Sequence, residues 1–584
     1  MTPFERSAII TVYRRARIVG ESKNCITADT SHQALLRYYA RTMVSTLRRL
    51  FGVSCAAAAL AGTLHAQDIT TRDLLDGLAN PARWLTYSGD YTGQRFSPLT
   101  QITPANAEQL AAQWTFQTGV VNKFEATPIV VDGVLYATGA LNHAWAIDGR
   151  TGKEIWHYQR QLPTGLKVCC GMVNRGFAVY HDRLFMVTLD AHFVALEMKT
   201  GHVIYDVEMA KIQDGFAGTG APLIVKNKVI VGIAGGEYAN RGFIDAYDPA
   251  TGSRVWRLYT IPDAGEKGSE TWKGDIWQRG GAPTWLSGTY DPSLNLVYWG
   301  TGNPNPDWNG DVRPGANLYT DSLLAIDPDS GRIKWHFQFT PHDTHDWDAN
   351  EIPVLADLTI AGRARKVVML ANRNGFFYVL DRATGEFLLG KPFLTNITWA
   401  TGIGPDGTPR LVAGQEPNDT GVVTCPDLYG GTNFMSPSYD PARRLFFVTA
   451  RETCMRFSRR PSPPNAALGD RTMGGIVVFL TEPKPTGALR AIDPATGERK
   501  WEIPYDGAGW AGVLSTAGGV VFSGDHEGNF FAADSKTGQK LFQFQTGSPI
   551  FGPPTSYAID GRQFVVIPSG STLTGFSLPK RPTT

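Results

Sequence analysis

The chain has 584 residues, of which 42% are hydrophobic and 19% are charged, so it can bury a substantial core. This composition indicates a globular protein and excludes extensive disorder outside the ends. The formal net charge of +1 gives no basis for nucleic acid or an anionic membrane surface as the main partner.

The first segment, residues 1–66, is predicted to be a leader rather than part of the fold. From Met43, the expected start, two arginines precede an apolar run, and a small residue stands before Gln67. This order is typical of a secretory signal peptide, and the run is too short for a membrane span. We therefore expect an exported protein that begins near Gln67, has one domain over 67–584 and makes no stable membrane insertion.

A sequence repeat dominates the chain after the leader. Its pattern is Ala-x-Asp-x-x-Thr-Gly-x-x-x-Trp, and it occurs with some drift in seven copies. The copies span 146–156, 195–205, 246–256, 325–335, 379–389, 491–501 and 532–542. Each copy predicts a strand that ends at Asp, a turn at Thr-Gly and a second strand that opens on a large apolar residue.

Further hairpins between the copies give each unit about four strands. Four-stranded repeats with an aromatic signature predict an all-β fold, an eight-bladed β-propeller with tryptophan-docking repeats. A partial eighth unit would contain Trp114 and be completed by C-terminal strands, so that both termini close the ring. We expect the repeat tryptophans to pack between blades, and the long gaps at 257–324 and 390–490 to carry functional loops.

Four cysteines remain after the leader. Taken alone, adjacent Cys169 and Cys170 are more simply explained as two separately buried thiols. Export to an oxidising compartment makes two disulfides economical, and we infer the bridges Cys169–Cys170 and Cys425–Cys454. A disulfide between neighbouring residues is poorly suited to a structural role, because consecutive α-carbons lie only about 3.8 Å apart, less than the usual disulfide span. The sequence contains no Cys-x-x-Cys-His motif, which excludes a built-in c-type haem.

Polar residues outside the repeat are concentrated at four places. These are Glu237, Asn303, the run 340–348 and Arg373. Each is weak evidence alone, since such residues near glycine commonly form turns. Asp346 and Asp348 are more informative, because residues two apart in an extended segment project to one face and close carboxylates repel unless a cation or shared proton offsets them. Oxygen ligands without a His/Cys cluster favour calcium or a similar hard ion over zinc.

Together these features resemble the methanol/ethanol dehydrogenase family of enzymes that use pyrroloquinoline quinone (PQQ). The matching motifs are Val168-Cys-Cys, Asn174-Arg-Gly, Thr219-Gly-Ala-Pro, Trp299-Gly-Thr-Gly-Asn-Pro, Pro341-His-Asp and Arg373-Asn-Gly. They occur in the family's order over essentially the whole mature chain. The resemblance implies a periplasmic enzyme that oxidises primary alcohols to aldehydes with PQQ and a metal ion, and that passes electrons to an external soluble cytochrome c.

The resemblance also implies roles for individual residues. PQQ would lie between the Cys169–Cys170 disulfide and Trp285. Further contacts to the quinone would come from Glu125, Arg175, Thr219, Asn433 and Trp510. The metal ligands would be Glu237, Asn303 and Asp346, with Asp346 also the catalytic base and Arg373 the cation beside the reactive carbonyl.

The metal prediction depends on Asp348. Family members that resemble lanthanide-dependent enzymes carry an extra Asp two residues after the catalytic one, and this chain has it. An added carboxylate suits a trivalent ion, so we expect a lanthanide, with calcium as the alternative. Ala234, Pro283, His345 and Phe434 depart from the family's commonest residues and would reshape the pocket, which leaves the substrate open.

Two other functions are compatible with the repeat. A non-catalytic periplasmic β-propeller scaffold would share the blades, but it would not need the adjacent cysteines together with Glu237, Asn303, Asp346 and Arg373. A membrane-bound sugar or polyol dehydrogenase with the same quinone is disfavoured, because no anchoring helix follows the leader. A homodimer is expected from the family resemblance alone.

Overall fold

The computed structural model describes residues 68–461 and 466–580, and the predicted leader at 1–66 lies outside them. Within the described residues there is one α-helix, α2 (Thr71–Asp76), and no helix there is long and apolar enough to cross a bilayer. Seven short 3-10 helices are also present: η1 (Gly77–Ala79), η2 (Ala107–Gln109), η3 (Ala140–Asn142), η4 (Ile212–Asp214), η5 (Ser269–Thr271), η6 (Ile276–Arg279) and η7 (Gly310–Val312). Nearly all other regular structure is β-sheet.

Most strands form four-stranded antiparallel sheets in chain order. The first three sheets contain β3 (Ile129–Val131), β4 (Val134–Thr138), β5 (His143–Asp148) and β6 (Glu154–Gln159); β7 (Ala178–Tyr180), β8 (Arg183–Val187), β9 (His192–Glu197) and β10 (Val203–Glu208); and β11 (Leu223–Val225), β12 (Lys228–Gly232), β13 (Phe243–Tyr247) and β14 (Arg254–Tyr259). The next three contain β15 (Thr289–Asp291), β16 (Leu296–Gly300), β17 (Ser322–Asp327) and β18 (Arg332–Gln338); β19 (Val354–Ile360), β20 (Arg363–Ala371), β21 (Phe376–Asp381) and β22 (Phe387–Pro392); and β26 (Ser438–Asp440), β27 (Leu445–Glu452), β30 (Thr486–Ile492) and β31 (Arg499–Tyr505).

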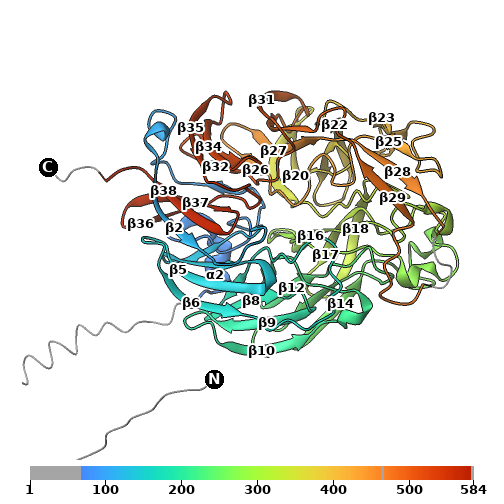
Figure 1. Cartoon of the computed structure of the whole chain (residues 1–584), viewed down its shortest axis with the longest axis horizontal. Coiled ribbons are helices and arrows are strands. Elements are labelled where there is room, and N and C mark those ends of the chain that lie inside the picture. Colours follow the sequence, from blue (N-terminus) through green and yellow to red (C-terminus); the bar gives the residue numbers. More distant parts are fainter. Residues whose placement is uncertain (1–67, 462–465, 581–584) are drawn as a thin grey trace, which may run out of the picture. The chain divides into compact units, whose positions relative to one another are not determined.

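Two further sheets combine strands from distant parts of the chain. One contains β32 (Leu514–Thr516), β33 (Val520–Gly524), β34 (Asn529–Asp534) and β35 (Lys540–Gln545), with β1 (Phe96–Ser97) parallel to β32. The other contains β36 (Thr555–Ile559), β37 (Arg562–Ser569), β38 (Thr572–Ser577) and β2 (Ala111–Gln117). In Figure 1 the blue strand β2 lies beside the red β37 and β38, and the sheets follow one another around a common centre. This is the architecture of a β-propeller.

The sequence repeat sets how neighbouring sheets pack. Trp156 on β6 donates from Nε1 to the carbonyl oxygen of Met198 in the next sheet, at 3.0 Å. Gly201 in that sheet's Thr-Gly turn has φ 74°, and a Cβ there would lie 2.7 Å from the Trp156 ring. Glycine therefore allows both the left-handed turn and the close approach of the ring. The predicted turn and the predicted tryptophan thus belong to one contact between successive sheets.

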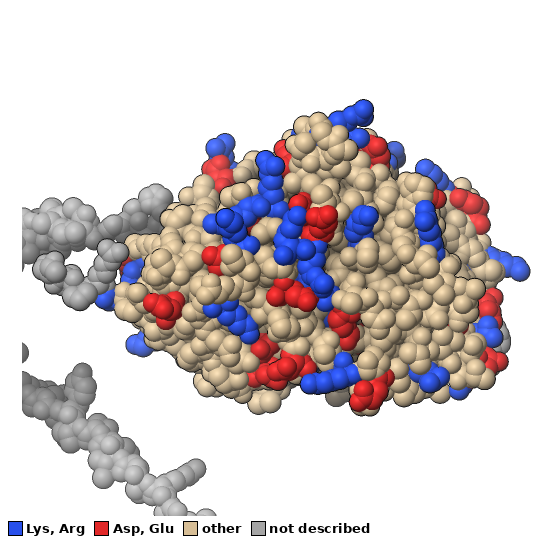
Figure 2. All heavy atoms as spheres, turned by 90° about the horizontal axis from the view of Figure 1, so that it is seen from above, with Lys and Arg blue, Asp and Glu red and all other residues tan. Residues whose placement is uncertain are grey.

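The long gap in the repeat between β22 and β30 holds two additional small sheets. They contain β23 (Ala400–Ile403) and β24 (Pro409–Leu411), and β25 (Val422–Thr424), β28 (Met455–Arg459) and β29 (Gly475–Phe479). Cys425 and Cys454 form a disulfide between the end of β25 and the start of β28. Figure 2 shows basic and acidic side chains interspersed over the viewed face, in keeping with the near-neutral net charge.

Candidate active site

The residues expected at the active site lie on two types of loop, and both types are found at the same end of the sheets. In a four-stranded antiparallel sheet, the entry to the first strand and the loop between the second and third strands lie at the same end. Cys169 and Cys170 lie between β6 and β7, Asp346 and Asp348 lie between β18 and β19, and Glu237 lies in the β12–β13 loop. The Thr-Gly turns join the third and fourth strands, so they lie at the opposite end.

A cavity opens among these connections. Its empty volume is about 840 Å³, part of it open to solvent. Twelve of the residues expected at the site line it: Glu125, Cys169, Cys170, Arg175, Thr219, Glu237, Trp285, Asp346, Asp348, Arg373, Asn433 and Trp510. The structure therefore brings together residues spread over almost 400 positions of the chain.

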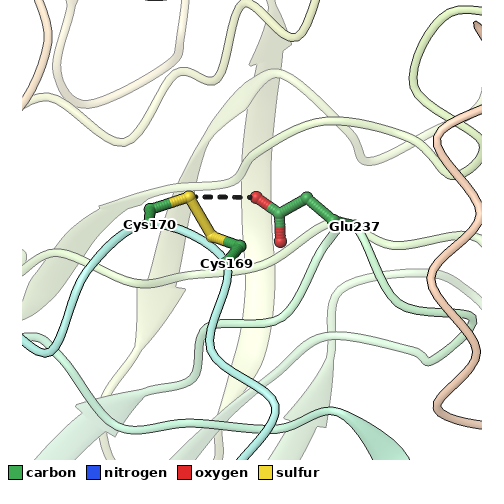
Figure 3. Close-up of side chains that lie close together, drawn as sticks. All are labelled: Cys169, Cys170 and Glu237. Atoms are coloured by element: carbon green, nitrogen blue, oxygen red, sulfur yellow. Dashed lines mark hydrogen bonds between the residues drawn. A yellow bond between two sulfur atoms is a disulfide. The ribbon is translucent and has the colours of Figure 1, made fainter. Parts of the chain in front are cut away.

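A disulfide between neighbouring residues forms part of the cavity wall. Cys169 and Cys170 are joined, with their α-carbons 3.8 Å apart. Figure 3 shows the Glu237 carboxyl facing this disulfide, with Oε1 3.5 Å from Cys170 Sγ. A disulfide sulfur carries no hydrogen and no thiolate charge, so the three residues cannot act together as a metal-ligand set. The disulfide is instead a compact, apolar surface of the cavity.

Arg175 provides positive charge on the cavity wall and is held from two directions. Its Nη2 lies 2.8 Å from Oε2 of Glu125, and both side chains are almost fully buried. The guanidinium also lies over the Trp285 ring, 4.9 Å from the ring centre, an arrangement that favours a cation. Thr219 Oγ1 donates to the Trp285 carbonyl oxygen at 3.2 Å. A ligand in the cavity would therefore meet the cation of Arg175, the broad ring of Trp285 and the carboxylate of Glu125.

Asp348 is the most highly connected carboxylate of the site. Its Oδ2 accepts from Trp285 Nε1 at 2.7 Å and pairs with Arg373 Nη2 at 3.0 Å. Its Oδ1 accepts from the backbone N–H of Asn303 at 2.6 Å. A Cβ on Gly302 would lie 2.2 Å from this oxygen, so glycine is needed for the carboxylate to sit there.

In one part of the cavity wall, the carboxylates of Glu237, Asp346 and Asp348 lie around a single guanidinium, that of Arg373. Burial, and then the charge of Asp348, raise the pKa of Asp346 well above its usual range. Burial likewise raises the pKa of Glu237 to about 7, with Asp348 adding to the shift. Burial disfavours the charge of Arg373, but Asp348 and Asp346 outweigh it and raise the pKa of this guanidinium. Three carboxylates against one arginine favour a bound multivalent cation.

Asn303 is the one expected site residue that does not line the cavity. It is almost fully buried behind the wall and donates from Nδ2 to Oδ1 of Asp307 at 3.0 Å, which leaves its own side-chain oxygen free to serve as a ligand. Asn433 lines the cavity and donates from Nδ2 to the Tyr429 carbonyl oxygen at 2.9 Å. The Trp510 ring stacks on Phe434, with ring centres 5.6 Å apart.

Some lining residues were not anticipated from the sequence. Lys123, Lys167 and Tyr429 all line the cavity. Asp307 was also missed, although it is fully buried and bonded to Asn303. Its position four residues after Asn303 was the only local signal, whereas nothing local marks the other three.

The residues present fit a metal ion and a planar anionic cofactor. Oε2 of Glu237 is buried and accepts no hydrogen bond from the described residues, so it is available to a bound cation. Carboxylate and amide oxygens are ligands for a hard cation. Arg175 and the indole of Trp285 offer a charge and a stacking surface for a flat, negatively charged ring system.

Comparison with known proteins identifies the family of this chain. The family model described as the β-propeller domain of PQQ-dependent glucose/ethanol/alcohol dehydrogenases matches residues 84–390 and 483–565. The chain belongs to the PQQ-dependent alcohol dehydrogenase family. Quinoprotein alcohol dehydrogenase PedH of Pseudomonas putida is 39% identical over 553 residues, which cover 90% of this chain and 92% of that protein.

Two further relatives are lanthanide enzymes by name. The lanthanide-dependent methanol dehydrogenase of Methylorubrum extorquens is 35% identical over 557 residues, which cover 89% of this chain and 90% of that protein. A solved structure of a europium-containing methanol dehydrogenase superposes with a TM-score of 0.82 at 32% identity, covering 87% of this chain and 100% of the other. Family membership makes this chain an oxidoreductase that acts on alcohols and confirms the expected enzyme class.

Proposed function

We propose that this protein oxidises primary alcohols to aldehydes, with PQQ in the cavity and a metal ion held by Glu237, Asn303, Asp346 and Asp348. One observation carries the proposal: a disulfide of neighbouring cysteines, a cation–aromatic pair and converging carboxylates all line one cavity in a chain of this family. The choice of metal ligands rests on charge, because the buried carboxylates of Glu237, Asp346 and Asp348 outnumber the one guanidinium beside them, that of Arg373.

The cofactor-binding roles follow from the chemistry of the lining residues. The Cys169–Cys170 disulfide and Trp285 would hold the ring system, and Arg175 would pair with a carboxylate of the quinone. Glu125 keeps Arg175 oriented through their 2.8 Å ion pair. Thr219, Asn433 and Trp510 complete the set of proposed contacts. Bound PQQ supplies an electrophilic carbonyl that accepts a hydride from the alcohol carbon.

Asp346 is the proposed base. An alcohol must lose its hydroxyl proton as the hydride leaves carbon, and a carboxylate beside the substrate can accept that proton. Burial and Asp348 raise the pKa of Asp346, so a cation beside it is required to keep the carboxylate ionised. Arg373 Nη1 donates to the Asp346 backbone oxygen at 2.7 Å and thereby holds the base in place, while its charge can stabilise a developing oxyanion.

A lanthanide is the proposed metal, with calcium as the alternative. Asp348 supports this choice, because its carboxylate stands beside Asp346 and adds a third negative charge for a trivalent ion. Further support comes from the relative named a lanthanide-dependent methanol dehydrogenase and from the solved europium-containing methanol dehydrogenase.

Four further assignments belong to the same proposal. The eight sheets would be the blades of one ring that β2 and β38 close. The enzyme would work in the periplasm after removal of residues 1–66. It would pass electrons to a soluble cytochrome c, because the sequence contains no haem-attachment motif. It would form a homodimer.

The test is a metal exchange on purified, metal-free protein supplied with PQQ. Alcohol-dependent dye reduction is measured with lanthanum or calcium, for the wild type and for Asp348→Ala, with Asp348→Asn as the variant of matched shape. We expect lanthanum to support the wild type, and Asp348→Ala to lose this activity while keeping or gaining activity with calcium.

Other outcomes would favour another function. Turnover of sugars or polyols but not primary alcohols would favour a sugar or polyol dehydrogenase. Failure to bind PQQ or to turn over with any metal would favour a non-catalytic scaffold.

A further inference from the structure

A segment outside the family match runs beside the proposed metal site. Residues 466–474, called the clasp here, directly precede β29 and fall in the stretch between the two matched ranges. In Figure 1 the orange strands β28 and β29 lie next to green loops of the earlier sheets. The clasp contacts the loops that carry Glu237 and Asn303 and the loop that carries the neighbouring cysteines.

The clasp first pairs with the Glu237 loop along the backbone. Thr472 N–H donates to the Glu237 carbonyl oxygen at 3.0 Å, and Ala239 N–H donates to the Asp470 carbonyl oxygen at 2.8 Å. Tyr238 and Arg471 form an antiparallel bridge between these bonds. The clasp therefore pairs with the backbone of residues 237–239 as an added strand would.

The clasp next joins the Asn303 loop through one buried side-chain pair. Thr472 Oγ1 donates to Asn305 Oδ1 at 2.6 Å, and Asn305 Nδ2 donates back to the Thr472 carbonyl oxygen at 3.1 Å. Asn305 Nδ2 also donates to the Gly236 carbonyl oxygen at 3.2 Å. Both side chains are at most 5% exposed. Asn305 thus links the residue before Glu237, the clasp and the loop of Asn303.

A third contact reaches the loop of the cysteines. Lys167 Nζ donates to the carbonyl oxygens of Gly469 at 2.7 Å and Gln213 at 2.8 Å. Lys167 precedes Cys169 by two residues and lines the cavity itself. All three site loops are therefore tied to one nine-residue segment.

We propose that Thr472 is a positioning residue that sets the distance between Glu237 and Asn303 and so controls metal affinity. This inference rests on the proposed function of these two residues as metal ligands. The physical reason is that the Thr472–Asn305 pair joins the clasp, which is bonded to Glu237, to the loop of Asn303, and so supports the direct bond from Asn305 to Gly236. A metal site holds its ion only when separate loops present their oxygens at fixed spacing. Partners that orient ligands from outside the coordination shell typically change metal affinity about 10- to 100-fold.

The experiment measures lanthanum affinity of the PQQ-loaded protein by competition with a colorimetric chelator. Thr472→Val removes the hydroxyl at nearly constant volume, and Thr472→Ser restores it. Thr555→Val is the control, since Thr555 on strand β36 is another buried threonine whose hydroxyl donates a hydrogen bond, in this case to the Pro128 carbonyl oxygen at 3.4 Å. Asn305→Ala removes the other half of the pair, so the double variant measures the coupling.

The proposal predicts that Thr472→Val weakens lanthanum binding about 10- to 100-fold, with Thr472→Ser and Thr555→Val within about threefold of wild type. Asn305→Ala should lose a similar factor, and the double variant should lose little more. Unchanged lanthanum affinity in Thr472→Val, with only a lower melting temperature, would refute the positioning role while leaving the metal site intact. A wild type that binds neither lanthanum nor calcium would refute the metal site and this inference together.

Discussion

The two disulfides should differ sharply in what their removal does. Cys425 and Cys454 are 29 positions apart, so their bond closes a long loop in the unfolded chain. Loop-closure entropy for that length corresponds to about 3.6 kcal/mol at 25 °C. The same relation gives only about 1 kcal/mol for the neighbouring pair Cys169 and Cys170. The first bond is therefore expected to stabilise the fold, and the second to serve the cavity.

The perturbation is a pair of double variants, Cys425→Ala/Cys454→Ala and Cys169→Ala/Cys170→Ala. For a domain of about 500 residues, the unfolding entropy is about 1 kcal/mol/K, so 3.6 kcal/mol lowers the melting temperature by about 3 to 4 °C. Scanning calorimetry of metal-free protein measures this shift, and a fluorescence titration measures PQQ affinity. Cys425→Ala/Cys454→Ala should have a lower melting temperature and an unchanged PQQ affinity. Cys169→Ala/Cys170→Ala should keep nearly the wild-type melting temperature and bind PQQ more weakly. A larger thermal loss in Cys169→Ala/Cys170→Ala would refute this division of roles.

Three further substitutions have defined outcomes. Glu125→Gln leaves the buried Arg175 without its charge partner and should cost about 3 to 5 kcal/mol, measured by calorimetry, with partial recovery in Glu125→Gln/Arg175→Met. Trp285→Phe shrinks the proposed stacking ring and removes the N–H that orients it through Asp348, so it should weaken PQQ binding about tenfold; unchanged affinity in the titration would contradict the proposed contact. Trp256→Ala removes a docking ring and should cost about 3 kcal/mol in unfolding experiments, while PQQ affinity of the folded protein stays constant.

The repeating part of the fold could be predicted because its rules are local. Trp156 needs a strand position beside Ala146 and a glycine at position 201 of the next repeat, and all three recur at fixed spacing. A period of this kind is visible in one sequence, since every unit must bury the same face against its neighbour.

The additional sheet of β25, β28 and β29 had no such signal. It lies in the gap between repeats, where functional loops were expected without a structure for them. Its strands β25, β28 and β29 do not carry the repeat pattern, and β28 pairs with both of the others. Its disulfide joins residues 29 positions apart. Composition and spacing could mark this region as unusual but could not give its fold.

The sequence predicted the motif residues of the active site but not the contacts that support them. Short motifs identified Cys169, Arg175 and Asp346 through their resemblance to a family, and the cavity brings these residues together. The Thr472–Asn305 pair has no motif and joins positions 167 apart, so only the three-dimensional arrangement reveals it. Long-range contacts between single polar side chains leave no period in the sequence.

In the proposed reaction, Asp346 acts as the base that accepts the hydroxyl proton of the alcohol. The most direct test of this role compares wild type with Asp346→Asn, each loaded with PQQ and lanthanum or calcium, in single-turnover oxidation of a primary alcohol. The asparagine keeps the shape and a metal-binding oxygen but cannot accept the proton. We expect Asp346→Asn to retain bound PQQ and metal while its oxidation rate falls about 10²- to 10⁴-fold. A variant that binds both and oxidises the alcohol at the wild-type rate would contradict this role.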